Sequence, residues 1–303
     1  MDERHASAQT AEKGTDFKSV PASMMWTVSA PERKGMSPHV KRWITALIAV
    51  PILFGIIAYG GREFFAVLIM MASLAGMYEY NQMAFGKGVC AEKIVTMASA
   101  LLILLTAVSG DRSLLLALLT FSVMAVLMLN LLRIRRKGLD MAPAGRALLG
   151  ILYIPLLMSH FILIRRTQSG ILWIFFILVL AFAGDVAAYY VGRRLGKRKL
   201  LPEVSPGKTV EGTIGLIAGS VVGCLIFRHW FFPVLTVTHA AILGLVGSVA
   251  GQLGDLSESA LKRAAGVKDS GVILPGHGGI LDRLDCLMFI TPFVFYYQEF
   301  VIR

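Results

Sequence analysis

Acidic side chains stand beside apolar segments near the C-terminal end of the chain. Asp255 ends one apolar segment, and Asp282 and Asp285 precede the last one. Asp282 and Asp285 are three residues apart, so they share one face if this segment is helical. Charged groups at membrane depth are costly and usually functional, and carboxylate oxygens are ligands that Mg²⁺ prefers, together with water and substrate phosphates. These residues therefore predict a Mg²⁺ site.

Basic residues lie between these aspartates. Lys262, Arg263 and Lys268 carry positive charge that neutralises phosphate oxygens in many sites. A solvated pair or a topology signal also explains Lys262 and Arg263 when they are taken alone. Next to three aspartates, they favour a site that handles phosphates.

A glycine-rich run, "GHGG" at 276–279, precedes the last apolar segment. Backbone amides just before a helix, together with the helix dipole, favour an anion. The run therefore predicts that Gly278 and Gly279 offer open amides to a substrate phosphate. A simple turn is the alternative, and His277 by itself is more typical of a hydrogen-bonding turn residue than of a general base.

A second polar stretch adds further candidates. Asp185 lies in or near an apolar segment, where it is costly unless it faces a polar cavity. The sequence "SPGKTVEG" that follows is not a P-loop, because the GxxxxGK[ST] spacing is absent. Lys208 and Glu211 are candidates to reach a polyphosphate or a metal. For Ser205 and Thr209 the ordinary interpretation is capping of the next helix.

The composition predicts the elements that must position these residues. The chain has 303 residues, of which 56% are hydrophobic and only 16% are charged, whereas soluble domains have about 25% charged residues. A membrane span needs about 20 mostly apolar residues. We therefore predict an all-α fold, a polytopic transmembrane helical bundle. Its nine candidate spans are 43–60, 63–83, 94–109, 113–132, 147–164, 171–192, 213–232, 239–256 and 286–302.

The basic residues predict the orientation of this bundle. With the N-terminus inside, the inner connections hold 17 Lys and Arg residues and the outer ones hold 5, which agrees with the positive-inside rule. The loops 193–212 and 257–285 then both lie on the cytoplasmic face of the cell membrane. The net charge of +11 is accordingly interpreted as a topology signal that also favours anionic headgroups, not as a sign of nucleic-acid binding.

The chain divides into two parts. Residues 1–40 are polar and lack the pattern of a cleaved signal peptide, so they predict a disordered cytoplasmic tail. Residues 41–303 form the predicted transmembrane catalytic domain. The three cysteines show no CxxC spacing, which argues against a disulfide framework or a zinc site.

At this point the motifs match a known family. The 27 residues from Ser259 to Asp285, "SALKRAAGVKDSGVILPGHGGILDRLD", resemble the signature of the integral-membrane phosphatidate cytidylyltransferases, also called CDP-diacylglycerol synthases. The resemblance covers roughly residues 183–303 and includes "GDLSES" and "SPGKTVEG". Two departures are Gly207, where lysine is common, and Leu216, where glycine is common. They affect details of the loops.

The resemblance implies a reaction and a site. CTP and phosphatidate would give CDP-diacylglycerol and pyrophosphate, with Mg²⁺ required and K⁺ in some cases a second cation. The residues implied as metal ligands are Asp255 and Asp282, with Asp285 and Asp185 as supporting or second-cation ligands. Lys208, Lys262 and Arg263 would neutralise the phosphates, and Arg283 would add a further positive charge. Ser259 would donate a hydrogen bond. The other residues expected to bind substrate are Lys268, His277, Gly278 and Gly279.

Two other functions remain open on the residues alone. A polytopic transporter explains the spans, Asp185 and Asp255, although transporters place charges near the midplane between broken helices. Another Mg²⁺-dependent lipid-phosphate transferase also uses several aspartates, but its Asp-rich helix pattern is not found here. The N-terminal spans are compatible with a homodimer interface or with a scaffold that faces membrane lipids.

Overall fold

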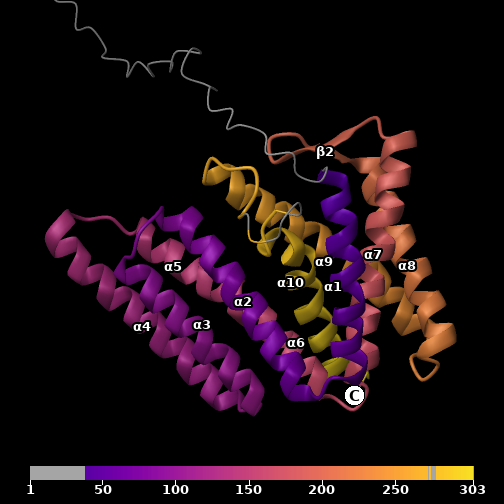
Figure 1. The fold of residues 1–303 in the computed structure, drawn as a ribbon, viewed down its shortest axis with the longest axis horizontal. Helices are drawn as coiled ribbons and strands as arrows, with labels where there is room; N and C mark the ends of the chain where they lie inside the picture. Colours follow the sequence, from indigo (N-terminus) through magenta and orange to yellow (C-terminus); the bar gives the residue numbers. More distant parts are fainter. Residues whose placement is uncertain (1–37, 272, 274–277, 303) are drawn as a thin grey trace, which may run out of the picture. The chain divides into compact units, whose positions relative to one another are not determined.

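The structure, a computed structural model, describes residues 38–271, 273 and 278–302. The predicted tail, residues 1–40, lies almost wholly outside this range, as does His277. The chain is helical nearly throughout, and Figure 1 shows the arrangement of the helices. The elements are α1 (Pro38–Tyr59), α2 (Arg62–Phe85), α3 (Ala91–Ser109), α4 (Arg112–Lys137), α5 (Ala142–Tyr153), α6 (Pro155–Arg166), α7 (Gly170–Leu195), β1 (Lys199–Leu201), β2 (Ser205–Thr209), α8 (Val210–Phe231), α9 (Val237–Ala264), α10 (Leu281–Tyr297) and a π-helical turn, η2 (Gln298–Ile302).

The predicted fold class is confirmed. Among the described residues, seven helices are long and apolar enough to cross a membrane: α2, α3, α4, the α5–α6 pair, α7, α8 and α9. α5 and α6 count as one span because helical hydrogen bonds continue across their junction, where Ile154 N donates to Gly150 O (3.0 Å) and Met158 N donates to Ile154 O (2.9 Å). The predicted segments 43–60 and 286–302 also lie in helices. Over the described residues, these helices are not both long enough and apolar enough to count as candidate spans.

The last long span continues further than the sequence predicted. α9 runs to Ala264, whereas segment 239–256 was expected to give way to a loop at 257. No glycine or proline interrupts residues 255–265, and Gly266, with φ 70°, ends the helix instead. Ser259, Lys262 and Arg263 are therefore helical residues, spaced to face the same side as Asp255.

Glycine and alanine bring α7 and α8 into close contact. A Cβ atom on Gly219 would come within 2.3 Å of Ala187 Cβ, and one on Gly223 within 2.6 Å of Ala183 Cβ. Small residues at such positions are typical of helix pairs in membranes, since they let the backbones approach. α7 and α8 lie side by side in Figure 1, with α9 next to α8 and α10 next to α9. The site is built at one end of these four helices.

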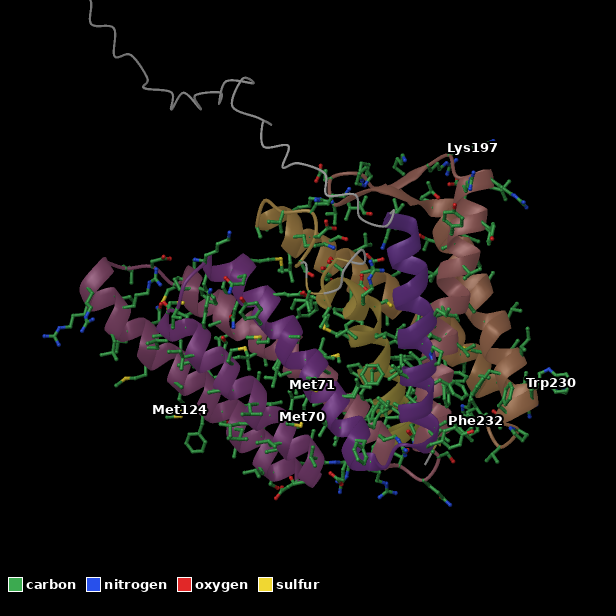
Figure 2. The ribbon with its side chains drawn as sticks, in the orientation of Figure 1. Met70, Met71, Met124, Lys197, Trp230 and Phe232 are labelled. Carbon is green, nitrogen blue, oxygen red and sulfur yellow. The ribbon has the colours of Figure 1, made fainter. Side chains whose placement is uncertain are left out.

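The two ends of the bundle are distinguished by their contacts. At one end Arg112 of α4 pairs with Glu299 of η2 (2.8 Å), and Arg165 of α6 donates to Gly60 O (2.9 Å). At the other end lies the β1–β2 hairpin, which an all-α prediction did not include. In Figure 2, Lys197 and Trp230 mark opposite ends of the α7–α8 pair, and the exposed Met124 projects from the outer side of α4.

Candidate active site

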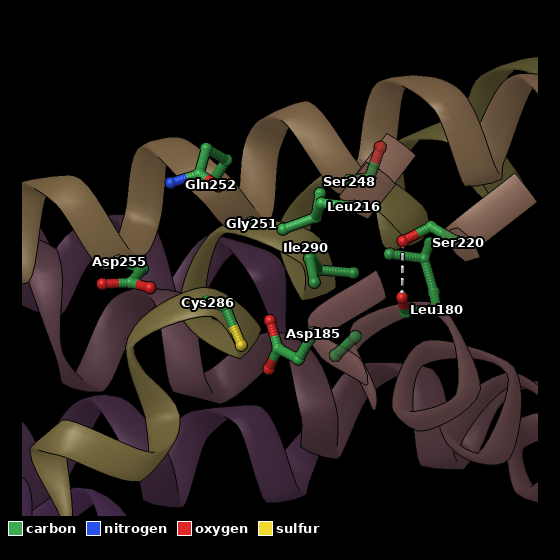
Figure 3. A pocket seen from close by; sticks show the side chains of 11 residues that line it. Leu180, Asp185, Leu216, Ser220, Ser248, Gly251, Gln252, Asp255, Cys286 and Ile290 are labelled. Atoms are coloured by element: carbon green, nitrogen blue, oxygen red, sulfur yellow. Dashed lines mark hydrogen bonds between the residues drawn. The ribbon is translucent and has the colours of Figure 1, made fainter. Parts of the chain in front are cut away.

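Two adjoining cavities lie where α7, α8 and α9 meet, beside α10 and the hairpin. The smaller is lined by Asp185 of α7, Gln252 and Asp255 of α9 and Cys286 of α10; Figure 3 shows the Asp185 carboxylate and the Cys286 side chain facing one another. The larger, about 300 Å³, adds Lys208 and shares Asp185, Gln252 and Asp255 with the first. The structure thus gathers predicted site residues from three elements, α7, β2 and α9.

The hairpin places Lys208 over the cavity. Lys208 Nζ lies 2.5 Å from Asp255 Oδ2. Thr209, the next residue, caps α8 by accepting from Gly212 N (3.1 Å), which confirms the capping interpretation for Thr209. The structure thus places Lys208 beside Asp255, and its role in phosphate binding stays a prediction.

Glu211 has a different role from the one that the sequence favoured. Its carboxylate accepts from the backbone N–H of Lys197 (3.0 Å) and of Arg198 (3.2 Å). These bonds hold the start of the hairpin against the first turn of α8. In this structure Glu211 supports the hairpin that carries Lys208, and it does not line either cavity.

Three carboxylates converge on this end of the helices. Asp255 interacts electrostatically with both Asp185 and Asp285, and the neighbouring cation is Lys208. Like charges brought together in this way repel unless a cation offsets them. Oxygen donors of this kind match the preference of Mg²⁺. The donor chemistry therefore fits a hard divalent cation, although no three such groups among the described residues already form a coordination shell.

Asp282 lies in a second cluster rather than with Asp255. Lys262 Nζ is 2.6 Å from Asp282 Oδ1 and 2.5 Å from Glu258 Oε2. Asp282 Oδ2 accepts from the backbone N–H of Ser270 (3.0 Å) and Gly279 (2.8 Å). Asp282, in the first turn of α10, therefore binds backbone amides of Ser270 and Gly279, whereas Asp285 interacts electrostatically with Asp255 and with both Lys208 and Lys262. The expected meeting of all three aspartates at one cation stays a prediction, as does the role of Asp282 as a metal ligand.

Glu258 is a site residue that the sequence analysis missed. Its side chain is fully buried and its described ionic partner is Lys262, four residues later on α9. The i,i+4 spacing of Glu258 and Lys262 in a helix was the available signal. It was hidden because this stretch was predicted to be a loop. Lys262 consequently stands between two carboxylates, which hold its ammonium group in place.

Glu79, from the second span, holds the signature loop in place. Its buried carboxylate accepts from Ser270 Oγ (3.1 Å), Ile280 N (3.0 Å) and Leu281 N (2.9 Å). Together Glu79 and Asp282 bind both ends of the segment 270–281. An acidic residue inside an apolar segment was the same signal that identified Asp185, so Glu79 could have been found from the sequence.

Backbone amides at the start of α10 do bind anionic groups, as the glycine run predicted. The groups bound in this structure are carboxylates of the protein itself. The Gly279 amide donates to Asp282, and the next two amides donate to Glu79. The expectation that Gly279 presents an open amide is therefore contradicted in this structure. Gly278, with φ 82°, makes the turn that aims these amides. Substrate binding by Gly278 and Gly279 remains a prediction.

Close packing explains why glycine stands at position 279. A Cβ atom there would lie 2.0 Å from Ser270 Oγ and 2.6 Å from Glu79 Oε2. We expect Gly279→Ala to lower activity at least about tenfold, because displacing Glu79 or Ser270 breaks charge-assisted bonds of about 1.5–3 kcal/mol each. Gly145→Ala is the matched control, since its added Cβ meets nothing within 4 Å and Gly145 lines neither acidic cavity. Equal activity of the two variants in a CTP-turnover assay would contradict this role.

The remaining predicted residues occupy less central positions. Ser259 Oγ donates to Asp255 Oδ1 at 3.4 Å, so it supports a carboxylate. Arg263 is exposed and donates to Val204 O (3.3 Å), which ties the hairpin connection to the end of α9. Lys268 and Arg283 are exposed at the same end. Ser259 therefore contacts the aspartate cluster directly.

Two buried polar groups from outside the signature face the acidic cluster. The Tyr153 hydroxyl, at the end of α5, interacts electrostatically with Glu258, Asp285 and Asp255. It has no hydrogen-bond partner among the described residues, and neither does Gln252 Nε2. A tyrosine near the end of an apolar segment is typical of membrane-interface anchors, so the sequence carried no specific signal for Tyr153.

A family model and several known proteins resemble this chain, and they indicate the same family. Residues 40–301 match the cytidylyltransferase family. The chain is 32% identical to a phosphatidate cytidylyltransferase of Staphylococcus haemolyticus over 253 residues, which cover 83% of this chain and 95% of that protein. It is 33% identical to one from Synechocystis over 285 residues, with 85% and 95% covered.

A shorter, stronger match falls on a part of the chain. It is 48% identical to a phosphatidate cytidylyltransferase of Bacillus subtilis over 153 residues, half of this chain and 57% of that protein. The matches to the other two relatives extend over the N-terminal spans as well, beyond the region where the sequence motifs were recognised. On the extent of the family match and of these relatives, the chain belongs to the cytidylyltransferase family.

Proposed function

We propose that the chain transfers a cytidylyl group from CTP to phosphatidate, giving CDP-diacylglycerol and pyrophosphate, at the cavities between α7, α8 and α9. The observation that carries the proposal is the meeting of Asp185, Asp255 and Asp285 with Lys208 at one end of the membrane helices. The relatives named phosphatidate cytidylyltransferase support the choice of reaction.

The chemistry requires charge neutralisation more than proton transfer. A phosphate oxygen of phosphatidate attacks the α-phosphorus of CTP, a new P–O bond forms, and the bond to the bridging oxygen of pyrophosphate breaks. The attacking oxygen is already anionic, so no strong base is required. Two unit charges of like sign at 4 Å repel by about 4 kcal/mol at an effective dielectric constant of about 20. Positioning and charge cancellation are therefore the main catalytic tasks.

The residues divide these tasks between them. Asp255, with Asp185 and Asp285, would hold Mg²⁺, and the resemblance adds Asp282 and a second cation such as K⁺. A bound Mg²⁺ supplies neutralisation of the phosphates on both substrates. Lys208, at the edge of the 300 Å³ cavity, and Lys262, held between Glu258 and Asp282, offer further positive charge to the phosphates.

The position of the site suits the two substrates. Phosphatidate keeps its acyl chains in the bilayer and its headgroup at the interface, whereas CTP is water-soluble and highly charged. A site at the ends of the spans meets both. We place this end, together with the N-terminus, on the cytoplasmic face, in accordance with the distribution of Lys and Arg. Labelling of a cysteine introduced at Lys268 from the outside only would contradict this orientation.

The decisive experiment uses the purified protein. We expect pyrophosphate release that requires CTP, phosphatidate and Mg²⁺ together, with incorporation of cytidine into lipid. Turnover of CDP-diacylglycerol with an alcohol, in the absence of CTP dependence, would instead indicate the other type of lipid-phosphate transferase. Substrate uptake into vesicles without CTP turnover would indicate a transporter.

A further inference from the structure

A second hollow lies at the same end of the bundle, away from the acidic cavities. It is a groove of about 1170 Å³ between the end of α2, the start of α3, the end of α4 and the start of α5. It shares no lining residue with either acidic cavity. None of its lining residues belongs to the signature stretch 259–285. The catalytic proposal therefore leaves it without a role.

The groove is lined by both basic and apolar side chains. Four arginines line it, against one acidic residue, Glu92, which leaves a surplus of three positive charges. The arginines are Arg133, Arg135, Arg136 and Arg146, and the apolar side chains include Met83, Phe85, Leu129 and Leu132. Arg133, Arg135 and Arg136 follow directly on the apolar part of α4, and Arg146 lies in the first half of α5, at the start of the next apolar helix pair. Ends of membrane spans are where headgroups meet acyl chains.

Two of the arginines are held in place by the protein. Arg133 pairs with Glu92 (2.5 Å), and its buried Nε has no hydrogen-bond partner among the described residues. Arg146 donates to Ala84 O (2.6 Å), and its guanidinium carbon lies 5.7 Å from the centre of the Phe85 ring. Fixed guanidinium groups lose less entropy when they bind a ligand. Arg135 and Arg136 are exposed, and no described residue pairs with either.

A topology signal alone does not explain this arrangement. The positive-inside rule calls for basic residues near a span, but not for four arginines that line one hollow together with apolar side chains. Guanidinium groups bind phosphate oxygens in a bidentate manner, and basic pockets between membrane helices bind acidic lipid headgroups. We propose that the groove binds the phosphate headgroup of an anionic phospholipid, at a site separate from the catalytic one.

The test measures binding of a lipid that is not a substrate. Short-chain phosphatidylglycerol is the probe, with short-chain phosphatidylcholine and inorganic phosphate as comparisons, and retention on the purified protein is measured by native mass spectrometry. The variant is Arg135→Gln with Arg136→Gln, two exposed residues outside the catalytic machinery. Its matched control, Arg194→Gln with Lys197→Gln, removes two exposed charges at the same end of the membrane helices.

We expect the wild-type protein and the control to retain phosphatidylglycerol, and the Arg135/Arg136 variant to bind it at least fivefold more weakly. The CTP turnover of this variant with saturating phosphatidate, assayed without phosphatidylglycerol, should be unchanged. Equal binding by all three proteins would overturn the site. Equal retention of phosphatidylcholine would show a purely apolar groove, and competition by inorganic phosphate at equal concentration would show a site for free anions. Either result would overturn the lipid assignment.

Discussion

Replacing Asp255 by Asn is expected to lower CTP turnover by a factor on the order of 10³. Asp255 lines the same cavities as Asp185, interacts electrostatically with Asp285, and pairs with Lys208. The substitution removes the negative charge that would hold Mg²⁺ and leaves Lys208 without its partner. Loss of metal stabilisation amounts to several kcal/mol of transition-state energy, and about 4 kcal/mol corresponds to a factor of about 10³.

A second measurement separates metal binding from a general loss of structure. A cation that binds only the folded protein raises the unfolding temperature. We expect Mg²⁺ to raise it for the wild-type protein and much less for Asp255→Asn. Asp269→Asn is the matched control, because Asp269 is exposed in the loop after α9. A variant at Asp255 that keeps activity within threefold of wild type, or keeps the full Mg²⁺ response, would refute the proposed ligand.

The second large effect is expected at Glu79. Glu79→Gln should lower activity by about 10- to 100-fold, although the residue lies outside the signature. The carboxylate accepts three hydrogen bonds from the ends of the signature loop, and bonds to a charged group contribute about 1.5–3 kcal/mol each. Glutamine keeps one acceptor oxygen, but its NH₂ group would face an N–H donor. The loop end and the first turn of α10 should then lose their fixed position.

The readout for Glu79 must distinguish positioning from catalysis. We expect faster hydrogen exchange at the Ile280 and Leu281 amides in Glu79→Gln, with activity partly restored in Glu79→Asp. Glu63→Gln on the same helix is the control, because Glu63 is exposed at the start of α2. If Glu79→Gln loses activity while both amides keep wild-type exchange rates, Glu79 does not act through the loop.

These two residues illustrate different limits of sequence reasoning. Asp255 and Lys208 could be identified from the sequence, because each stands in a recognisable motif at the edge of an apolar segment. Glu79 had a general signal, a charge within a span, but no motif indicated its partner about 200 positions later. Tyr153 had no specific signal, since aromatic residues are common near the ends of membrane helices.

The boundaries of elements were a separate source of error. The loop 257–285 was predicted to be longer than it is, because polar residues after an apolar segment look like a connection. In the structure α9 continues through Ser259, Lys262 and Arg263. The additional helical turns of α9 bring Glu258 and Lys262 together at i,i+4 spacing. They also fix the positions of these charged side chains.

The sequence by itself determined the all-α membrane fold, the family and most residues of the site. It did so because a membrane requires long apolar helices and because charges are too costly there to occur without a function. Only the tertiary structure decided which acidic side chain pairs with which basic one. Asp185 and Asp285 join Asp255, whereas Asp282 joins Lys262 and the loop ends. That division depends on where separate helices end and how closely glycine lets them pack, and residue spacing along one helix does not contain this information.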